Sequence, residues 1–392
     1  MVRSFLETPV PNDIAYSPAS VAQPIAEGLA RKGHEVTFFG PDGTQVNSHP
    51  NVKVETCGLR PLARTQSDFE DKVSTTDLFS DYLFSIYDLK MAREMCERAA
   101  RGEFDCVVFN HFESAMPLAK LFPTVQFVYI LHDFLDEDRR QAIEMHTSPN
   151  QHFISISDSQ RRDAPDLNYS ATVYNGIDID AYTLEEEAED YLMFSGRITP
   201  EKGVREAVQV AMQSGRRLLI AGSLSKKNYW YFDEHVKPYL NDKILFLGML
   251  DREQLIKYYK KAAALLMPIQ WQEPFGLSMA EAMACGTPVI AFNRGSVPEV
   301  IKNGKTGFIV DNSAEMIMAI DKLDSIRRRD CHEHVKKNFT YEIMVDNYER
   351  TLENIISNTT KKTSGRRRSG RKLYDDFSRI SRRLIGDNSP RV

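Results

Sequence analysis

The segment PIQWQEPFGLSMAEAMACGT, residues 268–287, joins a predicted strand to a predicted helix. Pro274 and Gly276 end the strand, and residues 277–285 have the composition of a good helix. The backbone N–H groups of residues 275–278 open that helix at the carboxyl end of the strand and have no partner within the helix. Such a helix start binds anions, so the segment predicts an anion site.

The same alternation of short apolar runs with helix-length stretches extends through most of the chain and predicts parallel sheets. The expected strands are residues 34–39, 104–110, 124–131, 152–156 and 171–174, followed by 191–195, 217–221, 243–247, 264–268, 288–292 and 307–310. Helices are expected between them, for example at 20–31 and 88–101. Each half of the chain therefore has enough strands for its own doubly wound α/β sheet.

The boundary between the halves is expected at residues 180–190, where the acidic run LEEEAED has no apolar periodicity. We expect residues 1–180 and 181–358 to form two Rossmann-like domains that face each other across a cleft, with the last helix packing back on the first domain. Residues 359–392 form a separate basic tail. Ligands of open α/β sheets lie beyond the carboxyl ends of the strands, so the cleft is the expected site.

Two glutamates flank the predicted anion site. Glu273 directly precedes the helix, and Glu281 lies five residues past Gly276. Carboxylates accept hydrogen bonds from the vicinal hydroxyls of sugar rings and ribose, so one ligand lying over the helix start would contact both. The alternative is that Glu281 faces solvent and Glu273 is an ordinary polar loop residue.

A second segment, YLMFSGRITPEKGV at residues 191–204, also ends a strand and begins a helix, near residues 202–203. Arg197 and Lys202 lie in its turn, and both would reach a diphosphate, the first as a bidentate fork and the second as a point charge. The alternative is that both are exposed cations beside a turn.

Composition excludes several classes of protein. The chain has 392 residues, 42% of them apolar and 27% charged, as in globular proteins of two or three domains. It has no run of 18 apolar residues and no apolar signal segment after Met1, so we expect neither a membrane-spanning helix nor secretion. The five cysteines are scattered without a C-x-x-C pair, which favours a cytoplasmic protein. Because G-x-G-x-x-G is missing after the first strand, an NAD-dependent Rossmann enzyme is disfavoured.

Positive charge is concentrated in the tail. Residues 359–392 hold eleven Lys or Arg and three acids, whereas the chain as a whole has a net charge of −5. The composition of residues 359–372 predicts disorder. Four apolar residues that follow share one helix face: Leu373, Phe377, Ile380 and Leu384. We expect this helix to lie on an anionic membrane surface; docking on the enzyme itself is the alternative, and specific nucleic-acid binding is not expected.

Three segments together resemble the retaining GT-B glycosyltransferases of family 4, also called glycosyl transferases group 1, which use nucleotide sugars. The most specific is the E-x7-E motif, Glu273 to Glu281 in EPFGLSMAEAMACGTPVIA. GRITPEKG and VYNGIDIDAY, residues 173–182, accompany it. The similarity runs from about residue 9 to residue 350 and leaves out the tail. It implies the GT-B fold of two Rossmann-like domains.

The resemblance also implies roles for individual residues. Glu273 matches the glutamate that binds hydroxyls of the donor sugar, and Glu281 matches the one that holds the ribose. Arg197 and Lys202 match the basic pair that binds the diphosphate. His132, in YILHDF at the end of a first-domain strand, matches the histidine that reaches the transferred sugar near the reacting carbon.

The helix start, Phe275, Gly276 and Leu277, would then bind the diphosphate as it gains negative charge when the anomeric C–O bond breaks. The donor is expected to be a UDP- or GDP-linked sugar, and the acceptor a hydroxyl of a glycolipid, glycan or small molecule. Neither a metal nor a bound cofactor is expected. The enzyme is expected to be cytoplasmic, with a peripheral position at the inner membrane face.

Departures from the family pattern fall on the acceptor side. Residues 5–10 form only a weak predicted strand, and the turn AYSPAS at 15–20 lacks the usual glycine pair. Without glycine, the backbone approaches a sugar less closely. The loop NRGS at 293–296 likewise keeps one glycine where two are common. A rival interpretation follows: a catalytically silent, nucleotide-sugar-binding subunit of a partner enzyme.

Overall fold

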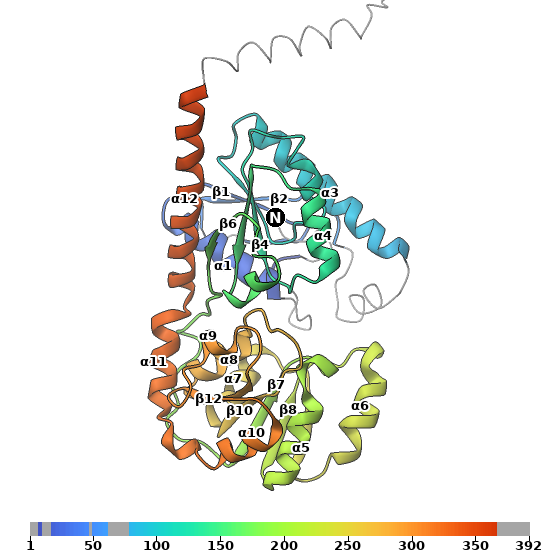
Figure 1. The fold of residues 1–392 in the computed structure, drawn as a ribbon, viewed down its shortest axis with the longest axis vertical. Coiled ribbons are helices and arrows are strands. Elements are labelled where there is room, and N and C mark those ends of the chain that lie inside the picture. The colour runs from blue at the N-terminus through green and yellow to red at the C-terminus, as the bar shows by residue number, and fades with distance from the viewer. Residues whose placement is uncertain (1–6, 10–16, 47–48, 62–77, 367–392) are drawn as a thin grey trace, which may run out of the picture.

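The computed structural model describes residues 7–9, 17–46, 49–61 and 78–366. These residues form two α/β bodies stacked along the long axis of the molecule, with one long helix running beside the upper body (Figure 1). The N-terminal body holds strands β1 to β6 and the C-terminal body strands β7 to β12. All the described strand pairs are parallel.

The N-terminal body contains a two-stranded sheet, β1-β2, and a four-stranded sheet in the order β3-β4-β5-β6. Its elements are α1 (Ser17–Arg31), β1 (Val36–Phe39), β2 (Val52–Glu55), α3 (Leu78–Ala100), β3 (Val107–Phe109), β4 (Phe127–Leu131), α4 (Glu137–Met145), β5 (Gln151–Ser155) and β6 (Tyr169–Thr172). Stacked and tilted rings of Phe109, Phe127 and Tyr129, all fully buried, fill the core on one side of the larger sheet. Every residue of β4 is buried, as expected for a parallel strand covered on both faces.

The C-terminal body is a six-stranded sheet in the order β12-β11-β10-β7-β8-β9. Its elements are β7 (Tyr191–Ser195), α5 (Val204–Ser214), β8 (Arg217–Ala221), α6 (Tyr229–His235), β9 (Ile244–Gly248), α7 (Arg252–Lys261), β10 (Ala264–Met267), α8 (Leu277–Ala284), β11 (Val289–Phe292), α9 (Val297–Val300), β12 (Gly307–Val310), α10 (Ser313–Ile320) and α11 (Arg328–Asn338). The strand order reverses between β7 and β10, which pair directly. In such sheets the loops that leave two strands at a reversal diverge and open a crevice at their carboxyl ends.

Within the described residues, the chain crosses between the bodies twice, and the two crossings run side by side. Ile177, just after β6, donates its N–H to the carbonyl of Phe339 at 2.9 Å, and Tyr341 donates to the carbonyl of Ile177 at 3.0 Å. After the second crossing, α12 (Tyr341–Arg366) packs along α1 of the N-terminal body, where Lys32 bonds to Asp346 and Glu349 at 2.8 Å each. The last helix of the chain therefore packs on the body formed by the first half.

Most strands lie where their sequence predicts. Strands β7, β8 and β12 match the predicted bounds at both ends. Strand β2 was not predicted, because VKVE has only two apolar residues, and these alternate with charged ones. The strands of the N-terminal half divide between two sheets within the described residues, rather than forming the single sheet expected.

The expectation of disorder at residues 359–372 is wrong for residues 359–366, because α12 continues as a helix to Arg366. A helix already built by tertiary packing extends at little cost through polar residues. The rest of the predicted basic tail, including the apolar face from Leu373 to Leu384, lies outside the described residues. The weak strand expected at 5–10 is not formed at residues 7–9, and the rest of it lies outside the described residues. Residues 15–16 of the turn expected at 15–20 also lie outside them, and residues 17–20 begin α1.

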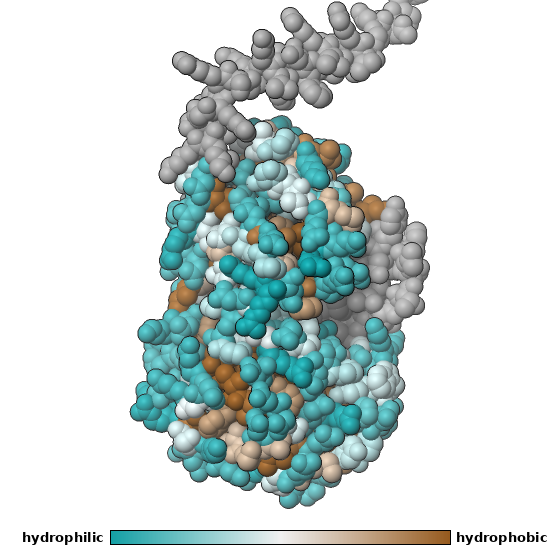
Figure 2. Space-filling model, in the orientation of Figure 1, coloured by the Kyte–Doolittle hydropathy of each residue, from teal (hydrophilic) through white to brown (hydrophobic). Residues whose placement is uncertain are grey.

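Hydrophilic side chains cover most of the face seen in Figure 2, and brown, hydrophobic atoms gather in a small area of the C-terminal body. None of the described helices is both long and apolar enough to cross a lipid bilayer. All five cysteines carry free thiols.

Close packing at the crossing predicts that position 176 does not tolerate a residue larger than glycine. A Cβ atom there would lie 2.3 Å from the carbonyl oxygen of Thr340 and 2.8 Å from the amide nitrogen of Tyr341, both backbone atoms that cannot rotate away. We expect Gly176→Ala to lower the free energy of unfolding by about 1–3 kcal/mol, as other overpacked sites do. Urea denaturation measures this. Gly196→Ala is the control, because its Cβ would meet its nearest neighbour at 3.8 Å; equal effects of both substitutions would contradict the prediction.

Candidate functional site

An ion pair bridges the two strands at which the strand order of the C-terminal sheet reverses. Lys202 ends the short 3₁₀ helix Pro200–Lys202 that follows β7, and Glu273 follows β10. The Lys202 Nζ lies 2.6 Å from Oε2 of Glu273, with the two side chains 17% and 8% exposed. Both residues are thus largely withdrawn from water, which argues against an ordinary polar loop residue at Glu273 and an exposed cation at Lys202.

Trp271 contacts both members of this ion pair. Its indole N–H donates to the same oxygen, Oε2 of Glu273, at 2.9 Å. The Lys202 ammonium lies over its ring, 4.7 Å from the centroid. A partly buried carboxylate needs hydrogen bonds as well as a counter-ion to offset the loss of hydration, and Trp271 supplies one. Sequence reasoning did not single out this tryptophan, although it lies two residues before Glu273.

The loop after β11 fixes the backbone of Glu273. Ser296 donates its N–H to the carbonyl of Glu273 at 2.9 Å and its hydroxyl to the carbonyl of Phe275 at 2.9 Å. Gly295 has a positive φ of 56°, and a Cβ there would lie 2.3 Å from the backbone nitrogen of Glu273. The single glycine kept in this loop is therefore the one that lets it approach Glu273.

Helix α8 begins immediately after Glu273. Gly276 is its N-cap residue, with φ 76° and ψ 69°, a left-handed conformation that glycine adopts without strain. The first turn of α8 contains no acidic side chain, so nothing in that turn neutralises the positive end of the helix dipole. The N–H groups of Gly276, Leu277 and Ser278 lie at this end, where an anion would be bound.

Glu281 lies one turn further along α8 and is only partly exposed. The hydroxyl of Tyr259, from α7, donates to its Oε2 at 3.4 Å, and Tyr182 is a second hydrogen-bond partner. Burial raises the pKa of the Glu281 carboxyl, an effect opposed by Tyr182 and by the charge of Arg252. Glu281 therefore does not face open solvent, and it lies among hydroxyl groups. The two tyrosines were not predicted as neighbours.

Arg197 lies apart from this cluster. Its side chain is 54% exposed, and its Nη2 is 3.7 Å from Oε1 of Glu201. The structure thus brings Lys202, Glu273 and the start of α8 together, while Arg197 lies at the rim in the exposed environment that the alternative interpretation described. The predicted turn holds both basic residues, but only one points inward.

His132 belongs to the other body, one residue past β4. Its Nε2 lies 2.9 Å from Oδ1 of Asn110, the residue that follows the neighbouring strand β3. Burial, and secondarily the nearby His111, lower the pKa of His132 to about 3, so the ring is neutral at physiological pH. Because an amide oxygen only accepts, Nε2 carries the proton in this arrangement and Nδ1 is an acceptor.

The two bodies meet beside Glu273. A small pocket is lined by Phe134, Ser159 and Gln160 from the N-terminal body and by Gln272, Glu273 and Pro274 from the C-terminal body. Gln160 donates its side-chain amide to the carbonyls of Leu131 and Asp133, the residues on either side of His132. The segment that carries His132 and the segment that carries Glu273 thus share this junction.

Metal-ligating clusters are not part of this site within the described residues. His34, Glu349 and Glu353 lie close enough together to hold an ion, but they are on the outer face where α12 meets α1, and Glu349 is already paired with Lys32. His332 and His334 instead contact the backbone carbonyls of Ala284 and Val300.

Comparison with known proteins identifies similar chains. Residues 178–338 match the family described as glycosyl transferases group 1. Glycogen synthase of Mycobacterium tuberculosis is 26% identical over 325 residues, which cover 72% of this chain and 76% of the relative. N-acetyl-alpha-D-glucosaminyl L-malate synthase of Bacillus anthracis is 24% identical over 379 residues, covering 86% of this chain and 93% of the relative.

Two solved structures share the fold. Sucrose-phosphate synthase from Thermosynechococcus elongatus superposes with a TM-score of 0.70 at 18% identity, covering 88% of this chain and 94% of that one. Anabaena HepE, solved in complex with UDP, superposes with a TM-score of 0.65 at 17% identity, covering 87% of this chain and 97% of that one.

The environment of Glu281 generates a prediction about stability. The raised pKa of its carboxyl means that folding disfavours the ionised form. The protonated carboxyl favours the folded state. Its contribution to the free energy of unfolding is fully present below the unfolded-state pKa, near 4.3, and is lost as the pH rises through the higher folded-state pKa. Glu281→Gln should therefore raise the melting temperature at pH 7, and the gain should shrink towards zero at acidic pH. A control is Glu234→Gln, at a carboxylate 67% exposed on α6; a gain of the same size there would contradict the argument.

Proposed function

We propose that this chain, a GT-B glycosyltransferase whose residues 178–338 match the glycosyl transferases group 1 family, moves a sugar from a nucleoside diphosphate sugar to a hydroxyl of an acceptor with retention of anomeric configuration. The contact that carries this proposal is the Lys202–Glu273 pair beside the start of α8. It places a cation, a carboxylate and helix N–H groups at the reversal point of a parallel sheet, where ligands of such sheets bind.

Glu273 is placed to accept hydroxyls of the donor sugar. Its Oε2 takes the bonds from Lys202 and Trp271, so Oε1 is the oxygen available to a sugar hydroxyl. Because the carboxylate is bonded and paired on one side, its orientation is set before the sugar arrives, and less ordering is needed when the ligand binds.

The nucleotide would be held along α8. The diphosphate would lie at the N-terminus of the helix, with Lys202 beside it and Arg197 reaching in from the rim. Glu281, one turn on and already within reach of tyrosine hydroxyls, would take the ribose hydroxyls. UDP is the first nucleotide to test, since structures of HepE have been solved with UDP and with UDP-glucose; GDP is the second.

The proposed chemistry uses these groups without a metal ion. As the anomeric C–O bond breaks, negative charge grows on the diphosphate, and Lys202 and the N–H groups of α8 stabilise it. Retention follows if the acceptor attacks from the face that the diphosphate leaves, with the departing phosphate oxygen taking the acceptor proton. A neutral His132 can hydrogen-bond a sugar hydroxyl without adding a positive charge beside the electron-poor anomeric carbon.

The activity is tested with purified protein and a panel of UDP- and GDP-sugars, with and without EDTA. We expect slow release of the nucleoside diphosphate from at least one donor, unchanged by EDTA. Loss of turnover with EDTA would overturn the metal-independent chemistry. Tight donor binding with no turnover, with water or with any of a set of hydroxyl acceptors, would instead support a non-catalytic subunit.

Substitution of Glu273 tests its proposed role. Glu273→Gln keeps the shape of the side chain but removes the charge that orients sugar hydroxyls and pairs with Lys202. We expect turnover to fall by about 100-fold, the size of effect seen when a reacting group is misplaced, while UDP affinity measured by calorimetry stays within a few-fold. The exposed Glu234→Gln serves as the control for expression and handling. Unchanged turnover of Glu273→Gln would remove this residue from the sugar site.

A further inference from the structure

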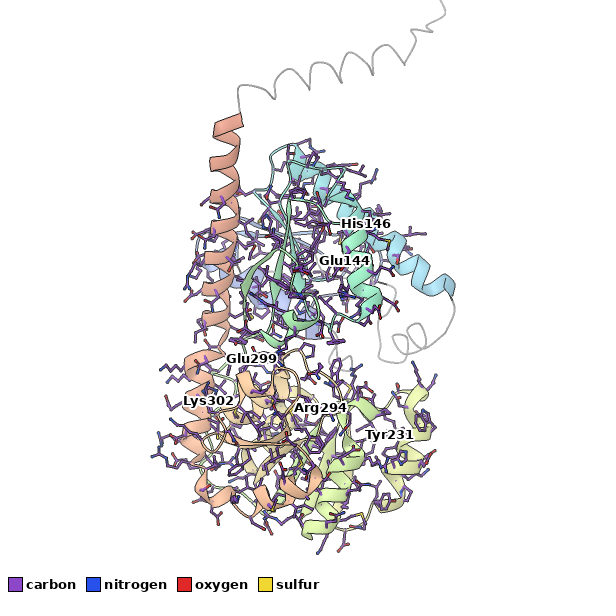
Figure 3. All side chains as sticks on the ribbon, viewed as in Figure 1. Glu144, His146, Tyr231, Arg294, Glu299 and Lys302 are labelled. Atoms are coloured by element: carbon purple, nitrogen blue, oxygen red, sulfur yellow. The ribbon has the colours of Figure 1, made fainter. Side chains whose placement is uncertain are left out.

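Glu299, at the end of the loop that follows β11, reaches across to the N-terminal body. It lies in α9, and Figure 3 places it at the level where the two bodies meet. Its carboxylate accepts the backbone N–H of Asp158 on Oε2 and that of Ser159 on Oε1, each at 2.7 Å. The hydroxyl of Tyr174 donates to Oε2 at 3.0 Å. The Glu299 side chain thus accepts two hydrogen bonds from the N-terminal body and a third from Tyr174, in the first crossing between the bodies.

These bonds are of a strong kind. Hydrogen bonds to a carboxylate are shorter and about twice as strong as those between neutral groups. Each oxygen takes one of two successive N–H groups at the start of the 3₁₀ helix Ser159–Asp163, a bidentate geometry that fixes orientation as well as distance. The arrangement therefore defines how α9 and this 3₁₀ helix lie relative to each other.

On its own side, Glu299 belongs to the loop that holds Glu273. Three residues before it, Ser296 bonds through its N–H to Glu273 and through its hydroxyl to Phe275. Gly295 donates its N–H to the side chain of Gln272 at 2.7 Å. A shift of α9 would therefore displace the backbone of residues 272–275, the segment that holds Glu273.

Tyr174 gives a second connection to the same segment. Its ring lies 6.3 Å from the ring of Phe275, and both rings contact Phe339, at 5.7 and 5.6 Å. Phe275 opens the turn into α8, and Phe339 lies in the second crossing between the bodies. The tyrosine that bonds to Glu299 thus also packs against the start of the anion site.

On the opposite side, the partners of Glu299 belong to the segment that holds His132. Gln160 follows Ser159 directly, and its side-chain amide bonds to the carbonyls on either side of His132. The path from Glu273 through Ser296, Glu299, Ser159 and Gln160 to His132 consists of hydrogen bonds and short stretches of backbone.

We propose that Glu299 is a positioning residue that holds the segment of His132 and the segment of Glu273 at their working separation across the two bodies. This inference rests on the proposed function, in which both segments contact the same transferred sugar. Glu299 touches neither the sugar nor the nucleotide, so it acts on turnover through the geometry of the two segments and leaves the nucleotide contacts of the C-terminal body unchanged.

The sharpest variant is Glu299→Gln. Whichever way the amide is turned, its NH₂ faces one of the two backbone N–H donors, so the bidentate contact cannot form. Glu315→Gln is the matched control: Glu315 also accepts a backbone N–H, from Asp311 at 2.9 Å, but within one body. Tyr174→Phe removes one of the three bonds and leaves the ring packing, so its effect should be intermediate.

We expect Glu299→Gln to lower kcat by about 10- to 100-fold, as displaced reacting groups do, with the donor KM within threefold of wild type and a similar melting temperature. Glu315→Gln should leave kcat unchanged. A parallel loss of kcat and thermal stability in Glu299→Gln, or no change in kcat, would overturn the proposal, since the first indicates a merely structural contact and the second no role.

Hydrogen exchange supplies a readout that does not need activity. In Glu299→Gln, the amides of residues 158–159 should exchange at least about tenfold faster, because their acceptor is lost, and so should the amides of residues 272–273 and 275–279. Faster exchange at 158–159 alone would show that the contact of Glu299 does not affect the segment that holds Glu273, and would overturn the proposal. If the wild type turned over no donor, the proposed function would fail while this measurement still decided whether the two segments are coupled.

Discussion

The buried pair of Lys202 and Glu273 is the contact on which the C-terminal body is organised. It spans the reversal between β7 and β10, so the two halves of the sheet meet through opposite charges at the edge where ligands of such sheets bind. Burying two charges is favourable only when geometry and further hydrogen bonds offset the lost hydration. Trp271, the close approach of Gly295 and the bonds of Ser296 provide that support, and each comes from a loop at the same end of the sheet.

The same arrangement balances the charges of the site. Lys202 neutralises Glu273. Under the proposed function, a diphosphate would draw the ammonium towards itself, and sugar hydroxyls would take its place as partners of the carboxylate. Lys202 and Glu273 would then each keep a hydrogen-bonding or ionic partner throughout donor binding. Glu281 differs, because tyrosine hydroxyls and the charge of Arg252 only partly offset the burial of its carboxyl, and its pKa is therefore raised.

Local sequence specified most of the fold and part of the site. Continuous apolar strands such as YLMFS and ALLM, each followed by a turn and a helix, fix both the strands and the loops at their carboxyl ends. The spacing of Glu273 and Glu281 around Gly276 depends only on one helix, so it was predictable. Trp271, Tyr259 and Glu299 matter through partners 22 to 141 residues away or through side-chain direction, which no local pattern encodes. For the same reason, sequence could not tell that Lys202 turns inward while Arg197 stays outside.

The return of α12 to the N-terminal body has a practical consequence for exchanging parts between related enzymes. A chimera cut only once, near residue 180, would pair α1 of one parent with α12 of another and break the contacts of Lys32 with Asp346 and Glu349. A recombinant that transplants donor recognition should carry residues 181–338 as an insert and retain the host's own residues from 339 onward, which contact its N-terminal half. Under the proposed function, the segment to exchange for a change of nucleotide is therefore an internal one and not the whole C-terminal half.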